Sequence, residues 1–159
     1  MSAEAKLTAR GFVLPPPLRV SGGPAASFTW ARRHGDRLYL SGHGPQAPDG
    51  SLAGPFGRVP SEVSLDDART AATRTALSML ATIKRTLGDL DEVAAWLAVH
   101  GVINADPGFE RTTAVLDPFS AVILDLYGPE AGSHARSATG ATALPLNVCL
   151  VVSAECALR

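Results

Sequence analysis

The sequence predicts a single α/β domain of the mixed α+β type, in which one mixed β-sheet carries two helices on the same face. Three features predict it. Short apolar runs that suit strands precede residue 42, an amphipathic segment spans Ser64 to Gly88, and the run from Glu92 to Ile103 is apolar on both strand parities. A chain of 159 residues is long enough for one substantial core. The expected order of elements is β-β-α-β-α-β-β.

Residues 1–26 are expected to be an extended N-terminal arm, and residues 27–159 the folded domain. Within the arm, Pro15-Pro16-Pro17 and Gly22-Gly23-Pro24 cannot continue a helix or join a central strand. The domain then begins with two short strand-like runs, Phe28 to Arg33 and Arg37 to Ser41. Because only His34-Gly35-Asp36 separates them, they predict a hairpin.

The clearest helix follows a loop rich in Gly and Pro. Ser64 can cap its first turn, Asp67 stands three residues later, and Gly88 lies just past its end. Apolar residues recur at steps of three and four and form one stripe, which predicts packing on a sheet. The stripe consists of Leu65, Ala68, Ala72, Ala76, Leu80, Ile83 and Leu87.

The strand from Glu92 to Ile103 is expected to be covered on both faces, with a right-handed crossover from the earlier strands. A second helix is expected to start at Asp117, since Asp suits the cap and Pro118 the first helical position, and to stop at Gly128-Pro129. Two strands follow, about His134 to Ala143 and Asn147 to Cys156. Helices cover only one side of this sheet, so a partner subunit is expected to bury the other.

Composition bounds the classes of function. With 46% hydrophobic residues, 18% charged residues and a net charge of −1, the chain is typical of a soluble globular protein, and no electrostatic feature favours nucleic acid. Neither a secretory signal nor an apolar run of membrane-spanning length is evident. Cys149 and Cys156 are seven residues apart and are expected to be reduced thiols in a cytoplasmic protein. No cofactor is expected.

Arg136 is the foremost candidate for ligand binding. It lies in His134-Ala135-Arg136-Ser137-Ala138, a strand-like run of small residues that gives no structural need for a cation. A guanidinium presents a planar set of donors that matches a carboxylate. The alternative is a strand Arg whose charged end reaches water.

These residues, together with other motifs along the chain, resemble the Rid superfamily of YjgF-like reactive imine deaminases. The motifs are Leu38 to Pro45 with Ser41-Gly42, Gly88 to Val93, Val102 to Ala105 with Pro107-Gly108-Phe109, and Gly132 to Ala138 followed by Leu144-Pro145. The chain is most similar to a divergent subgroup, also labelled endoribonuclease L-PSP-like. The resemblance implies a chorismate-mutase-like mixed sheet and a homotrimer shaped like a small barrel, with ligand clefts between subunits.

The resemblance also implies roles for individual residues. Arg136 matches the Arg that holds the carboxylate of a 2-imino acid, and Ser41 and Gly42 match a turn whose backbone lines the same cleft. Phe28 stands where active deaminases carry a Tyr, as an aromatic wall of the cleft or as core packing. Asp117 or Ser120 falls near the family's Asn in the second helix, although Asp117 also suits a helix cap.

Two departures put hydrolysis in doubt. Val151 occupies the position from which active members present a Glu, and loss of a positioned acid or base typically costs about 10²- to 10⁴-fold in rate. Glu155 is four residues further along, roughly 13 Å, and cannot substitute without a bulge. Ala138 replaces a frequent Cys, so a nearby thiol is absent too.

The four histidines are candidates for a metal site or a general base. His34, His43, His100 and His134 show neither the spacing nor the Cys partners of zinc motifs, so no metal is expected. His43 stands where the family usually has Gln. His134 is two residues from Arg136 and points to the same face, where it would supply a donor or a titratable base; the alternative is a surface or hydrogen-bonded core histidine.

Two classes of function therefore remain. One is a Rid-type hydrolase that acts on an imine or enamine after Arg136 has fixed its carboxylate. The other is a ligand-binding or regulatory trimer that keeps the Arg136 pocket and has lost hydrolysis, as Val151 and Phe28 favour. Endoribonuclease activity, attached to some relatives, has no support in the charge distribution.

Overall fold

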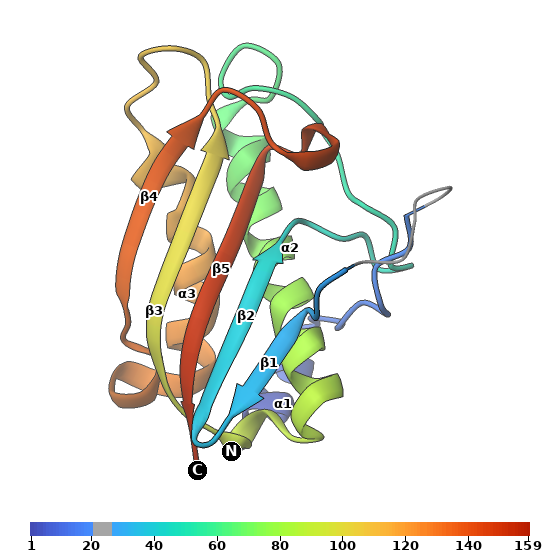
Figure 1. Ribbon diagram of the computed structural model, residues 1–159, viewed down its shortest axis with the longest axis vertical. Helices are drawn as coiled ribbons and strands as arrows, with labels where there is room; N and C mark the ends of the chain where they lie inside the picture. The colour runs from blue at the N-terminus through green and yellow to red at the C-terminus, as the bar shows by residue number, and fades with distance from the viewer. Residues whose placement is uncertain (21–26) are drawn as a thin grey trace.

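One five-stranded mixed sheet organises the molecule (Figure 1). The computed structural model describes residues 1–20 and 27–159; Gly22-Gly23-Pro24 of the expected arm lie outside them. The strand order is β1-β2-β5-β3-β4, with only β3 and β4 parallel. The strands are β1 (Ala31–His34), β2 (Arg37–His43), β3 (Val93–Asn104), β4 (Ala135–Ala141) and β5 (Leu150–Leu158). From β1 onward the α-helices and strands follow the predicted order β-β-α-β-α-β-β.

The predicted hairpin is confirmed, with a start three residues later than expected. His34 pairs with Arg37, and Gly35 takes the positive φ of 58° that a tight turn between strands requires. Ahead of β1, Phe28 is 54% exposed, which rules out core packing within one chain.

Helix α2 (Leu65–Leu87) covers the sheet as predicted. The Ser64 hydroxyl accepts a hydrogen bond from the Asp67 backbone N–H, and Gly88 ends the helix in the left-handed region with φ 83°. Figure 1 shows α2 and α3 (Thr112–Gly132) on the same face of the sheet. The core lies between the sheet and these helices, and its largest buried side chains include Trp96 and Phe119.

The start of α3 differs from the prediction. The helix begins at Thr112 rather than at Asp117, so Pro118 lies inside it and Asp117 is not its cap. Upstream residues extend the helix because Val115 and Leu116 are fully buried, and burial outweighs the favourable cap chemistry at Asp117. Gly128, with φ 76°, interrupts the helix where the stop was expected, and one more turn follows it.

Part of the expected extended arm is helical. Helix α1 (Ala3–Ala9) is capped by the Ser2 hydroxyl, and it buries Ala3 and Leu7 against the domain. Arg10 forms an ion pair with Asp125 of α3. The prolines that argued against a helix begin only at residue 15, so they do not constrain this earlier segment.

The last two strands are placed correctly but are shifted at their ends. Along β5, alternate residues from Leu150 to Leu158 are buried against the helices, whereas Val151, Ser153 and Glu155 face the side that no helix covers. Cys149 lies just before the regular strand, and both cysteines are buried and free. The uncovered face is the surface for which a partner subunit was expected.

Candidate functional site

Arg136 lies on the edge strand β4 and points toward α3. Its side chain is 18% exposed, and Nη1 donates to the Ser120 hydroxyl at 3.1 Å while Nη2 donates to Asp117 Oδ1 at 2.9 Å. The guanidinium is thus held by two side chains while part of it still reaches solvent. An open pocket of about 240 Å³ lies beside it, lined by Ser120, Leu124, Ser133, His134 and Arg136.

His134 joins the same cluster, as its spacing from Arg136 predicted. Nδ1 lies 2.7 Å from the Gly132 carbonyl oxygen, and Nε2 lies 2.8 Å from Ser120 Oγ. Because a carbonyl only accepts, Nδ1 carries the hydrogen, and in the neutral ring Nε2 accepts from the Ser120 hydroxyl. The result is one chain of donors, from Arg136 through Ser120 and His134 to the Gly132 carbonyl.

Asp117 has a different role from the cap that the sequence favoured. It lies in the second turn of α3, with its carboxylate on Arg136 and its side chain 51% exposed. A half-exposed ion pair contributes only about 0 to 1 kcal/mol, so this contact is readily exchanged for another. Asp117 thus supplies a carboxylate beside the candidate binding Arg, on a different element from the apolar Val151.

The other predicted site residues lie elsewhere in the same chain. Ser41 and Gly42 are on β2, which β5 and β3 separate from β4, a distance of three strand spacings or roughly 14 Å. The Ser41 hydroxyl donates to the Thr29 carbonyl, and a Cβ on Gly42 would lie 2.6 Å from Val151 Cγ1. Phe28 packs edge-on against Trp30. One subunit alone does not bring this group to Arg136.

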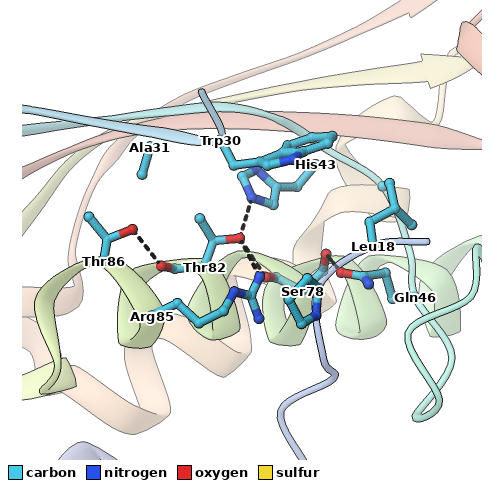
Figure 2. Close-up of a pocket in the computed structure, with 11 residues that line it drawn as sticks. Leu18, Trp30, Ala31, His43, Gln46, Ser78, Thr82, Arg85 and Thr86 are labelled. Atoms are coloured by element: carbon cyan, nitrogen blue, oxygen red, sulfur yellow. Dashed lines mark hydrogen bonds between the residues drawn. The ribbon is translucent and has the colours of Figure 1, made fainter. Parts of the chain in front are cut away.

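A second polar pocket, which the sequence did not predict, lies between α2 and the end of β2 (Figure 2). His43 Nε2 is 2.9 Å from Thr82 Oγ1, and Arg85 Nη2 donates to the same oxygen at 3.1 Å. Burial, with a contribution from nearby Arg85, lowers the pKa of His43 from 6.5 to about 4. The available signal was the set of polar residues Thr75, Ser78 and Thr82 among the buried residues of α2.

No group of three or more His, Cys, Asp or Glu side chains in residues 1–20 and 27–159 could hold a metal ion. Over the same residues, every helix is too short or too polar to cross a bilayer.

The chain is similar in sequence and in fold to several known proteins. No family model matches the chain. Protein TCP17 of Trypanosoma cruzi is 29% identical over 138 residues, which cover 86% of this chain and 84% of that protein. The protein Atu1372 of Agrobacterium tumefaciens, of unknown function, has a TM-score of 0.85 at 29% identity, over 98% of this chain and 91% of that one. A candidate endoribonuclease from Shewanella oneidensis has a TM-score of 0.89 at 24% identity, over 99% of this chain and 100% of that one.

The Rid family itself is represented by a more distant structure. YyfA of Yersinia pestis, a protein of unknown function in the conserved Rid family, has a TM-score of 0.58 at 17% identity, over 90% of this chain and 98% of that one. Such low identity speaks for the fold rather than for the activity. The chain therefore has the fold of the Rid superfamily, which its motifs had predicted.

Proposed function

We propose that this chain is a Rid-superfamily protein that binds a small carboxylate-bearing molecule through Arg136. The observation that carries the proposal is the held guanidinium beside an open pocket. Ser120 and Asp117 take two of its five N–H donors, and no other acceptor among the described residues engages the rest. A positioned planar group with donors to spare is suited to a carboxylate.

We propose further that the binding cleft is completed by a second copy of the chain in a homotrimer. Phe28, Ser41 and Gly42 cannot reach Arg136 of their own subunit, and the helix-free face that carries Val151 is left without a cover. An assembly that buries about 800 Å² or more per partner would meet both needs. Sedimentation equilibrium at micromolar concentration should give a trimer, and a monomer would contradict the assembly.

Hydrolysis of the bound imine or enamine is the second candidate function, favoured by the polar groups around Arg136. Water would add to the imine carbon to form a C–O bond, and the C–N bond would break with release of ammonia. Asp117 would orient the water, and the Ser120 and His134 pair would carry protons. The alternative is a non-catalytic ligand-binding or regulatory trimer. Val151 favours this alternative because its alkyl side chain can neither donate nor accept a proton.

Binding is tested by calorimetric titration with pyruvate. We expect Arg136→Ala to weaken binding by about tenfold or more and Arg136→Lys to rescue poorly, because a charged hydrogen bond contributes about 1.5–3 kcal/mol and Lys lacks the planar set of donors. Arg74→Ala, at an exposed position of α2, is the matched control. Unchanged affinity in a folded Arg136→Ala variant would show that the residue is structural.

Asp117 separates the two candidate functions. Asp117→Asn removes the carboxylate that competes for Arg136, so we expect pyruvate to bind severalfold more tightly under either reading. An ammonia-release assay with freshly generated 2-aminoacrylate then decides between them. If wild type is active and Asp117→Asn is slower by about 10²-fold or more, the protein hydrolyses imines. If wild type releases no ammonia beyond the spontaneous rate, it is a binding protein.

A further inference from the structure

The pocket above α2 is separate from the Arg136 site and has its own charged group. The indole of Trp30 and the ring of His43 lie on its sheet side, with centroids 5.3 Å apart, and they face Ser78, Thr82 and Arg85 of α2 (Figure 2). Pro17 and Leu18 of the N-terminal arm close another side. The volume of this pocket is about 240 Å³.

Nearly all of the polar groups in this pocket are already committed to other protein groups. His43 Nδ1 donates to the Ser41 carbonyl at 2.5 Å, so its Nε2 accepts the Thr82 hydroxyl hydrogen. The Ser78 hydroxyl donates to Gln46 Oε1, and the Gln46 amide donates to the carbonyls of Pro16 and Gly50. The Thr86 hydroxyl donates to the Thr82 carbonyl at 2.8 Å. None of these groups has a hydrogen left for a ligand.

Arg85 is the charged group of this pocket that keeps unused donors. Its Nη1 donates to the Pro15 carbonyl at 3.2 Å and its Nη2 to Thr82 Oγ1 at 3.1 Å, so three of its five N–H groups remain unused within the described chain. No carboxylate of the described residues lies within 4.0 Å of it. The two hydrogen bonds hold the guanidinium at the mouth of the pocket, so a ligand would meet a cation that is already oriented.

The same arrangement of groups occurs at the Arg136 site. There an Arg donates to a hydroxyl, the hydroxyl to His134 Nε2, and His134 Nδ1 to the carbonyl two residues earlier. Here Arg85, Thr82, His43 and the Ser41 carbonyl follow that order. In both places the hydroxyl and the imidazole are saturated, and the unused donors belong to the Arg.

The size and walls of the pocket define the ligand. A volume of about 240 Å³ is below the usual range for drug-sized ligands, so the pocket suits a small molecule. Among the described residues that line it, Arg85 is the single Lys or Arg, which suits one negative charge. Trp30, Leu18 and Ala31 offer apolar surface to the remainder of the molecule. We propose that this pocket binds a small monocarboxylate, with the carboxylate on Arg85 and the aliphatic end against Trp30 and Leu18.

Trp30 supplies the readout. The chain has two tryptophans, and Trp96 is buried in the core between the sheet and α3. Butyrate is titrated into the full-length Arg136→Ala protein while tryptophan fluorescence is recorded. The Arg136→Ala substitution removes carboxylate binding in the proposed cleft. Butyramide, which has the same shape without the charge, and inorganic phosphate are the comparison probes. We expect a saturable change with butyrate and none with butyramide or phosphate.

Substitutions show which of the two sites causes the change in tryptophan fluorescence. In the same background, Arg85→Gln should weaken butyrate binding by about tenfold or more, whereas Arg74→Gln on the exposed side of α2 should leave it unchanged. A response that Arg136→Ala abolishes and Arg85→Gln retains would assign butyrate to the cleft and overturn this proposal. Absence of saturation in the Arg136→Ala protein would overturn it as well.

A structural loss on replacing Arg85 is distinguished by a second measurement. Arg85 also holds the Pro15 carbonyl, so Arg85→Gln could loosen the arm. Changes in the amide chemical shifts of the Arg136→Ala protein on adding butyrate then show where butyrate binds. Shifts that concentrate on the Trp30 indole N–H, Gly44 and Thr82 support the pocket, and shifts elsewhere or none at all contradict it.

Discussion

Because of His43, we expect the folded protein to lose stability in mild acid. The His43 ring is 3% exposed, and burial lowers its pKa from 6.5 to about 4, with a further contribution from Arg85. In the unfolded chain the ring takes up a proton as the pH falls through 6.5, whereas in the folded protein it stays neutral until about pH 4. The unfolded state therefore binds more protons in this window, and the free energy of unfolding decreases as the pH falls.

The magnitude follows from the two pKa values. Each unit of difference corresponds to about 1.36 kcal/mol, so the shift from 6.5 to about 4 amounts to about 3 kcal/mol once the pH is below both values. Between about pH 8 and pH 5, where the carboxylates remain largely ionised, the expected loss is about 2 kcal/mol. That is a large share of the stability of an ordinary domain.

Urea unfolding at a series of pH values measures this loss. His43→Gln, which keeps a polar side chain that cannot titrate, should remove most of the pH dependence in this window. His34→Gln is the control, because His34 is exposed at the turn between β1 and β2, away from the central strands of the sheet. A wild-type stability that is flat between about pH 8 and pH 5 would refute the reasoning, as would a His43→Gln variant with the wild-type slope.

Three further changes test the site and the fold. Val151→Glu should raise turnover of 2-aminoacrylate by up to about 10²-fold, and an unchanged rate would contradict the assignment of that position. Gly101→Ala should destabilise by about 1–3 kcal/mol in urea unfolding, because its Cβ would lie 2.5 Å from Leu116 Cδ2, and adding Leu116→Ala should give a combined loss below the sum of the two. Ser64→Ala should cost about 1 kcal/mol through loss of the α2 cap, and an effect near zero would show that the cap is dispensable.

Elements that depend on neighbouring residues were predictable from the sequence. The hairpin needed only the Gly35 turn between two apolar runs, and α2 needed its stripe together with Ser64 and Gly88. The shared face of His134 and Arg136 followed from strand parity. Each of these features is decided within a few residues by backbone sterics and local hydrogen bonds.

Only the tertiary structure decided which groups meet. Asp117 suited a helix cap locally, but buried residues upstream extended α3 and placed its carboxylate on Arg136, 19 residues away. The pairing of His43 with Thr82 spans 39 residues, and no periodic pattern in the sequence predicts it. Contacts of this kind depend on how a sheet and its helices pack, because packing sets the distances that local patterns do not encode.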